Sequence, residues 1–439
     1  MTDLARTLAA LSVGIPALSA GLVSLAPTPR HSDLVARTAG LATALPVLAL
    51  ATLALAHGGA PLVDGRWTLV DRASGLMLAI TGLVGLASVL MSPSYLRTGG
   101  RSWLSPTASH AWYYTVLFVF WAALIAAPLA DNLALVWLII DATTATSALL
   151  VSFSGRREAL EAGWKYLILT TLGLSLALFG IILIAIAQGA AGHHGLAALD
   201  WQALGNAARA LPHGTVVAGF VLLIVGLATK IGWAPVHNWL PDAHSEAPAP
   251  VSALLSSTLL PTVMLVAWRA KEALAPAVGA STASALFVGL GLASILVAVP
   301  FLWKTMPWKR LLAYSSLEHM GIIAVGIGFG TPVAITGVII HVAGHAFAKS
   351  LGFYAAQPPR RIALGVSLVA LGGLPPSPLF VSELLIVLGG IASGHPVLAA
   401  ITAVAVAAGF LGLLHGLIEG IIGDRELSPL PPSLAGGEL

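Results

Sequence analysis

The sequence predicts an all-α polytopic membrane protein of about 13 transmembrane helices, and two observations support this fold class. Of the 439 residues, 57% are hydrophobic and only 9% are charged, whereas soluble domains carry about 25% charged residues. Apolar runs of about 20 residues, the length that spans a bilayer, recur along the chain and are joined by short loops. A single soluble globule is therefore excluded.

The helices are expected in three groups. Three N-terminal helices (1–110) precede a first set of five (111–270) and a second set of five (281–422), and the Pro- and Gly-rich tail 428–439 is expected to be disordered. The first run has no clear small-residue cleavage site, so we expect a retained helix and not a signal peptide. The thirteen runs begin near Leu4, Leu34, Trp67, Ala111, Leu133, Trp164, Thr215, Val251, Ser281, Leu311, Pro332, Ile362 and Pro396.

Lysine and arginine are distributed unevenly between alternate loops. One set of loops carries eleven of these basic residues and the other five, and basic loops favour the cytoplasmic side. With an odd number of helices, the N-terminus is then outside and the C-terminus is cytoplasmic.

The lack of cysteine excludes disulfides and thiolate-held iron–sulfur clusters, so we expect neither a cofactor nor a resident metal in this chain.

The seventh expected helix is interrupted. Only 14 residues, 215–228, precede the Thr229–Lys230 pair; they make roughly 21 Å of helix, less than the hydrocarbon thickness of about 30 Å. Gly232 and Pro235 then break the helix. Free backbone groups at membrane depth are tolerated only where protein or a water-filled cavity satisfies them, so this break belongs to the interior.

A second interruption is expected in the twelfth helix, where Pro375, Pro376 and Pro378 precede Glu383. The two interrupted helices lie five helices apart, and because five is odd, the two five-helix sets face the membrane in opposite senses. Paired interruptions in inverted repeats point to an ion pathway near the bilayer midplane. Two unrelated proline kinks are the alternative interpretation.

Ionisable residues within the spans favour the pathway. Asp141 follows eight apolar residues in the fifth helix; a charge at that depth costs at least about 2.5–3.5 kcal/mol and needs a partner. Lys230 is the expected partner, and a packing pair with Lys165 is the alternative. A row of two histidines and a lysine in the eleventh helix recurs at intervals of four, on one helix face, and histidine titrates near neutrality. The candidate pathway residues are Asp141, Lys230, His237, Glu318, His319, His341, His345, Lys349 and Glu383.

Each of these residues also has a simpler interpretation. A lone membrane histidine is more often a hydrogen-bonded packing residue, and Lys349 could extend to the interface. The pair His341 and His345 could bind a metal, but zinc needs a third and fourth ligand and no cysteine is present. The two histidines are also poorly placed to be both axial ligands of one haem. So many ionisable side chains, each of which is costly to bury in a membrane, nevertheless favour an ion-conducting role over a structural scaffold.

Four motifs resemble the antiporter-like subunits shared by respiratory complex I, Mrp-type sodium/proton antiporters and membrane-bound hydrogenases. They occur in the family's order between roughly Trp112 and Glu419. The branch of the family that they most resemble is the large membrane subunit of hydrogenase-4 and formate hydrogenlyase-type complexes. This resemblance is carried by the Glu318–His319 pair and by the segment DAHSEAPAPVSALLSS of the first motif. The motifs are KIGWAPVHNWLPDAHSEAPAPVSALLSS, KRLLAYSSLEHMG, HVAGHAFAKSLGFYAA and GGLPPSPLFVSELL.

The resemblance implies a proton-translocating subunit with two inverted half-channels. Asp141 would pair with Lys230, the eleventh-helix row would form the central relay, and Glu383 would be the exit group. The chain would lie in a prokaryotic inner membrane beside other membrane subunits and a peripheral redox arm, whose subunits would hold iron–sulfur clusters and, in a hydrogenase, a nickel–iron centre. No redox centre, substrate or nucleic acid is expected in this chain.

The resemblance leaves two alternatives, and the chain departs from the family at several positions. A cation/proton antiporter subunit would need a sodium route, for which acidic residues are few, and a proton-conducting partner of an inorganic-carbon uptake complex also fits. Asp141 is one methylene shorter than the usual glutamate, which lengthens the expected pair. Ser256 stands where complex I relatives often carry histidine, so a water would bridge there, and Pro261 should kink the eighth helix. No long lateral helix follows the thirteenth span, which excludes the largest complex I variant.

Overall fold

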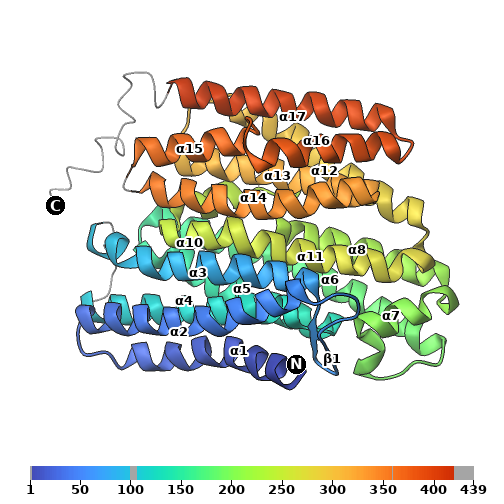
Figure 1. Ribbon diagram of the computed structural model, residues 1–439, viewed down its shortest axis with the longest axis horizontal. Coiled ribbons are helices and arrows are strands. Elements are labelled where there is room, and N and C mark those ends of the chain that lie inside the picture. The colour runs from blue at the N-terminus through green and yellow to red at the C-terminus, as the bar shows by residue number, and fades with distance from the viewer. Residues whose placement is uncertain (1, 99–105, 358, 420–439) are drawn as a thin grey trace.

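The helices run side by side along a common direction, as a computed structural model of the chain shows (Figure 1). It describes residues 2–98, 106–357 and 359–419, and the predicted tail 428–439 lies outside these ranges. Twelve helical segments in the described ranges are long and apolar enough to cross a membrane. Two shorter apolar helices, α15 (Arg361–Leu371) and α16 (Pro378–Ala392), make up the predicted twelfth run. All thirteen expected runs are therefore helical, as predicted.

The remaining elements follow the chain in order. They are α1 (Thr2–Ser24), α2 (Pro29–Ala56), β1 (Val63–Gly65), β2 (Thr68–Val70), α3 (Arg72–Thr98), α4 (Pro106–Leu129), α5 (Leu133–Val151), the 3₁₀ turn η1 (Ser152–Ser154), α6 (Arg157–Ala190), the 3₁₀ turn η2 (Leu196–Leu199), α7 (Trp201–Ala207), the 3₁₀ turn η3 (Ala208–Ala210), α8 (His213–Ile231), α9 (Trp239–Glu246), α10 (Ala249–Leu254), the π turn η4 (Leu255–Leu259), α11 (Leu260–Val278), α12 (Ala280–Leu302), α13 (Trp308–Phe329), α14 (Pro332–Ala356) and α17 (Pro396–Leu417).

A short β-hairpin precedes α3 and corrects the expected start of the third helix. Strands β1 and β2 pair antiparallel with Val63 opposite Val70, so Trp67, the expected first residue, lies in the turn. The Asp71 carboxylate accepts a hydrogen bond from Ser74 N at 2.7 Å, and α3 begins at Arg72. In Figure 1 the hairpin and α7 lie at the same end of the bundle, which we call the hairpin end.

The interruption of the seventh helix is found where Gly232 predicted it. Helix α8 ends at Ile231, and Gly232 adopts φ +83°, where a Cβ would overlap Leu240 Cδ1; only glycine fits there. The backbone Ala234 N donates to Ser294 Oγ of α12 at 3.0 Å, Trp233 N donates to Ala228 O, and the Trp233 indole Nε1 donates to Met320 O of α13 at 3.0 Å. Backbone at membrane depth is thus satisfied by protein.

The eighth and twelfth expected helices are also irregular, in each case close to a proline. Pro261, expected to kink the eighth helix, is the second residue of α11, and the π turn η4 directly before α11 separates it from α10. A proline lacks the N–H that would continue the regular ladder. In the twelfth run, α15 and α16 are separated by residues 372–377, where Gly373 adopts φ +66° and Ser377 caps α16 by accepting from Leu379 N.

The sixth helix begins seven residues earlier than expected, at Arg157 in place of Trp164, and runs to Ala190. Its basic end faces the charged helix α9. Asp242 of α9 pairs with Arg310 at 3.1 Å and with Lys165 at 3.5 Å. These pairs join α6 and α9 of the first five-helix set to α13 of the second.

Candidate functional site

Eight of the nine predicted ionisable side chains lie on five helices, α5, α8, α13, α14 and α16. Lys230, His341, His345 and Lys349 are fully buried, and Glu318 and His319 are nearly so. Asp141 and Glu383 are half-buried. We call these eight residues the buried row. Burying charge without a bonded partner is costly, so the contacts of each member decide what the row can do.

Lys230 on α8 binds hydroxyl groups. Its Nζ donates to Thr144 Oγ1 of α5 at 2.7 Å and to the hydroxyl of Tyr166 on α6, and it lies 4.6 Å from the centre of the Tyr166 ring. Tyr166 also shares a hydrogen bond with Ser147 at 2.7 Å. Neither hydroxyl partner of Lys230 was predicted, because threonine and tyrosine in an apolar run are also ordinary packing residues.

Asp141 acts on Lys230 from α5, one turn before Thr144, but does not touch it. Its charge is felt by the lysine, yet within the described ranges no ion pair of 4.0 Å or less joins the two. The expected direct contact is thus not formed, in keeping with the missing methylene of aspartate. The alternative pair with Lys165 is not found either, because Lys165 binds Glu161 at 2.6 Å and Asp242 at 3.5 Å.

Lys349 on α14 is held by α13. Its Nζ donates to Leu312 O and to Ser315 Oγ, both at 2.6 Å. Leu312 O also accepts from Ser316 Oγ, which lies 2.8 Å from Ser256 Oγ. Ser256 is therefore linked through Ser316 to Leu312 O, which also accepts from Lys349.

The histidines form a cluster between α13 and α14. His319 Nδ1 lies 3.0 Å from His341 Nε2, and His341 Nδ1 lies 2.8 Å from Ser382 Oγ of α16. The His345 ring lies 5.2 Å from the His319 ring. His319 Nε2 and both nitrogens of His345 are buried with no hydrogen-bond partner among the described residues.

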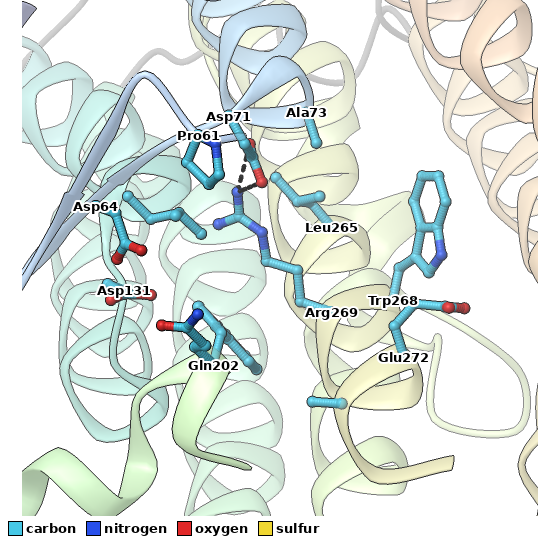
Figure 2. Close-up of a pocket in the computed structure, with 13 residues that line it drawn as sticks. Pro61, Asp64, Asp71, Ala73, Asp131, Gln202, Leu265, Trp268, Arg269 and Glu272 are labelled. Atoms are coloured by element: carbon cyan, nitrogen blue, oxygen red, sulfur yellow. Dashed lines mark hydrogen bonds and ion pairs between the residues drawn. The ribbon is translucent and has the colours of Figure 1, made fainter. Parts of the chain in front are cut away.

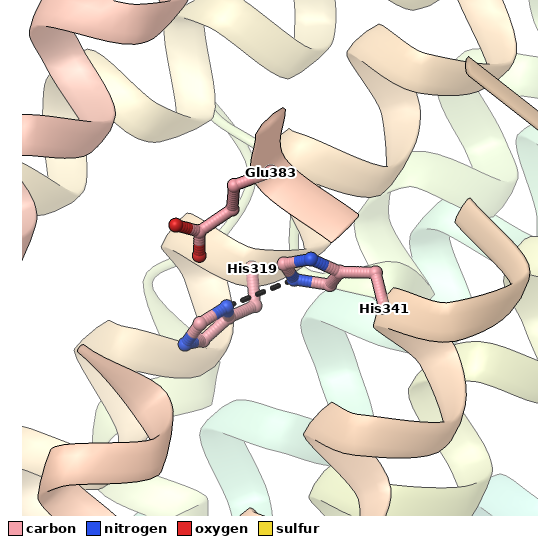
Figure 3. A group of neighbouring side chains, drawn as sticks. All are labelled: His319, His341 and Glu383. Carbon is pink, nitrogen blue, oxygen red and sulfur yellow. Dashed lines mark hydrogen bonds between the residues drawn. The ribbon is translucent and has the colours of Figure 1, made fainter. Parts of the chain in front are cut away.

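The two glutamates of the buried row rest against glycines. Glu383 on α16 sits over Gly373 at the break, so a Cβ there would lie 2.5 Å from Glu383 Oε2. Glu318 on α13 reaches Gly409 of α17, where a Cβ would overlap Glu318 Oε1. The ligand atoms of His319, His341 and Glu383 all lie within 4.8 Å of one another (Figure 3).

His237 stands apart from the buried row, whereas His244 was missed. His237 is half-buried in the loop between α8 and α9, and no hydrogen bond to the row is found for it in the described part of the chain. His244 on α9 is fully buried; its Nδ1 binds Leu240 O at 2.9 Å and its Nε2 has no partner among the described residues. Helix α9 follows α8, which carries Lys230, and the His244 ring lies 5.8 Å from that of Phe353 on α14, which carries Lys349. The signal for it was a second histidine in the interrupted segment.

A pocket of about 450 Å³ opens at the hairpin end, lined by acidic side chains and by Trp201, Trp268 and Arg269 (Figure 2). Arg269 is occupied by Asp71, at 2.9 and 3.0 Å from its two carboxylate oxygens. Asp131, two residues before the start of α5, is buried in the wall; burial first, then the Asp200 carboxylate, raise its pKa from 3.8 to about 6. This pocket was not predicted from the sequence.

Comparison with known proteins identifies a family whose model matches the part of the chain that holds most of the buried row. The family model described as "NADH:quinone oxidoreductase/Mrp antiporter, TM" matches residues 130–358, more than half of the chain. The chain belongs to this family. The matched region contains every predicted pathway residue except Glu383, and the resemblance drawn from the four motifs is confirmed.

Curated relatives of the family cover most of the chain. A hydrogenase-4 component F homolog of Methylacidiphilum infernorum is 35% identical over an alignment of 385 residues, and the match covers 82% of this chain and 80% of that protein. An NADH-quinone oxidoreductase subunit N of Desulforudis audaxviator is 26% identical over an alignment of 432 residues, and the match covers 89% of this chain and 83% of that protein. The chain is thus similar to both branches named by the sequence, with higher identity to the hydrogenase-4 type.

Solved structures share the fold at 21% sequence identity. A chain of the membrane-bound sulfane sulfur reductase, an archaeal respiratory membrane complex, aligns with TM-score 0.81 over 97% of this chain and 91% of its own length. A chain of the Mrp complex from Dietzia sp. aligns with TM-score 0.79 over 94% and 80%. A chain of Thermus thermophilus respiratory complex I aligns with TM-score 0.71 over 96% and 93%. The expected antiporter-like membrane fold is therefore established.

Proposed function

We propose that this chain is the proton-translocating membrane subunit of a redox-driven complex of the hydrogenase-4 or complex I type. The observation that supports it is the buried row, in which lysines, histidines and carboxylates share the protein interior without direct ion pairs between the lysines and the carboxylates within the described ranges. Such groups are retained in membrane interiors where they serve ion movement. Membership of the family adds independent support.

Protons would pass between side chains and intervening water. Buried polar atoms are normally hydrogen-bonded, so the bare nitrogens of His319, His345 and His244 are natural places for water molecules. Water there would connect the surroundings of Lys230 with the cluster at His319 and His341. Glu383 would then be the exit group beside the break in the twelfth run, as the family resemblance implies.

The assignment includes a membrane orientation and partners. The C-terminus would be cytoplasmic in a prokaryotic inner membrane, and the two sets of five helices would be inverted repeats. The structural relatives are parts of multi-subunit membrane complexes, so other membrane subunits would flank this chain. A peripheral arm with iron–sulfur clusters, and nickel–iron in a hydrogenase, would supply the energy, because this chain has no cysteine to hold such clusters.

Gentle extraction of the tagged chain separates this function from its two alternatives. We expect co-purifying subunits with cluster-binding cysteines and iron, with nickel if the complex is a hydrogenase. Small membrane partners without iron would favour a cation/proton antiporter. A zinc-containing soluble partner would favour an inorganic-carbon uptake complex.

Replacement of Lys230 tests the pathway itself. Lys230→Ala should leave the complex assembled and abolish proton movement into vesicles that contain the purified complex. Lys271→Ala is the matched control, because Lys271 is also buried but pairs with Glu272 at 3.5 Å outside the buried row. Proton movement retained in Lys230→Ala would exclude that lysine from the pathway, and loss of assembly alone would indicate a structural role.

A further inference from the structure

Three side chains from three helices converge on one point in the buried row. His319 on α13, His341 on α14 and Glu383 on α16 place their ligand atoms within 4.8 Å of one another (Figure 3). Two imidazoles and one carboxylate are a ligand set that zinc and neighbouring transition metals accept, with water in the fourth position. We infer that this chain has a transition-metal site at His319, His341 and Glu383, which takes Zn²⁺ or a similar divalent ion and thereby blocks the histidine pair.

The hydrogen bonds around His341 orient its nitrogen for a metal. Ser382 donates its hydroxyl proton to Leu379 O at 2.7 Å, so its oxygen accepts the proton of His341 Nδ1 at 2.8 Å. His341 Nε2 then carries a lone pair, which points to His319 Nδ1 and accepts its proton. A second hydrogen-bonded group that fixes the tautomer of a ligating histidine is the usual support of a metal site.

The distances suit a small tetrahedral ion. Zinc binds imidazole nitrogen at about 2.0–2.1 Å, which sets two tetrahedral nitrogens about 3.3 Å apart, and the two nitrogens now lie 3.0 Å apart. Metal entry would move the His319 proton from Nδ1 to Nε2, which is buried and has no partner among the described residues. The ion would take the place of the shared proton, so two metal–nitrogen bonds would replace the His319–His341 hydrogen bond.

Two further ionisable side chains, Glu318 and Lys349, lie near the three ligands. Glu318 lies close enough to act on Glu383 and adds a second carboxylate near a divalent ion, whereas Lys349 acts on His319 and opposes it. Magnesium and calcium prefer oxygen-only shells, so a site with two imidazoles selects against them. Glu383 borders the break between α15 and α16, where Pro375 and Pro376 are exposed.

Cobalt(II) is the probe of choice, because a four-coordinate cobalt ion has intense visible absorption that the hydrated ion lacks. The full chain, purified in detergent, should develop this absorption at one equivalent of Co²⁺ and lose it when Zn²⁺ is added. Glu383→Gln and His341→Gln should each weaken binding at least tenfold. Ser382→Ala, which removes only the orienting hydroxyl, should weaken it by about 10–100-fold.

The exposed neighbours His193 and His194 are the obvious adventitious site. The double variant His193→Gln, His194→Gln should keep the absorption, and elution from size exclusion should show that all variants remain folded. Absorption that survives Glu383→Gln and Ser382→Ala but disappears in the double surface variant would overturn the proposal. Because Glu383 lies at a break, Glu383→Gln decides the matter even if His341→Gln fails to fold.

The consequence for transport rests on the proposed function and is measured separately. Zn²⁺ should slow proton movement by vesicles carrying the complex, and Ser382→Ala, which leaves every pathway residue in place, should lower that sensitivity by about 10–100-fold. Cobalt binding without any zinc effect on proton movement would leave the metal site in place and remove the histidine pair from the pathway. Absence of the cobalt absorption would reject the site whatever the transport result.

Discussion

Gly373→Ala should disable the exit side of the pathway while leaving the fold intact. Gly373 adopts φ +66°, and a Cβ there would lie 2.5 Å from Glu383 Oε2. Ordinary contact begins near 3.4 Å, so the carboxylate must withdraw by about 0.9 Å, the difference between these distances. The clash is with the far end of a flexible side chain, so Glu383 moves and the backbone need not. A misplacement of about 1 Å can slow a reaction about 10²-fold.

The matched control is Gly394→Ala in the loop before α17. Gly394 adopts φ +82°, so both alanines carry the same backbone cost of roughly 1–2 kcal/mol, but a Cβ at Gly394 meets nothing within 4 Å. Both variants should lower the melting temperature alike, and only Gly373→Ala should slow proton movement, at least tenfold, in vesicles carrying the purified complex. Equal proton movement in the two variants would refute the role of Glu383.

Three further predictions follow from individual contacts. Tyr166→Phe removes a hydrogen bond to the Lys230 ammonium, worth about 1.5–3 kcal/mol, so proton movement in the same vesicles should slow about tenfold; an unchanged rate would contradict the role of that hydroxyl. Ser256→Ala breaks the contact with Ser316 and should slow it only a few-fold, because Ser316 keeps its bond to the α13 backbone; complete loss would contradict this. Asp131 has its pKa raised from 3.8 to about 6, first by burial, so its native carboxyl holds a proton that the unfolded chain releases in that window, and stability falls as the pH rises through it. Asp131→Asn should therefore raise the melting temperature at pH 8, by at most about 3 kcal/mol in stability, and hardly at pH 4; equal shifts at both would reject the assignment.

The sequence predicted the parts of the fold that are decided locally. Long apolar runs predict spans because the bilayer admits little else, and Gly232 and the prolines near Glu383 predicted both breaks. The β-hairpin was missed, although VDGRWTLV carries a turn between β-prone residues, because its apolar residues read as the start of the third span. The early start of α6 was missed because charged residues at a helix end do not look like part of a span.

The candidate site was predicted in its ionisable members and not in their contacts. Lys230 and the eleventh-helix row are recognisable because charge in a span is rare. Their hydroxyl partners, Thr144 and Ser315 among them, are common in helices and carry no such signal. The third ligand atom beside His319 and His341 comes from Glu383, 42 residues after His341, and only the packing of α16 against α14 and α13 brings it there.

The closing of the seventh-helix break by α12 and α13 has a consequence for biosynthesis. The acceptor of Trp233 Nε1 lies 87 residues later in the chain, and the acceptor of Ala234 N lies 60 residues later. At about 5–20 residues per second, the ribosome needs between about 4 and 17 s to deliver Met320 after Trp233. During that interval the two donors lack the acceptors that they have in the folded chain, so the break of the seventh helix is closed only after α12 and α13 have been made.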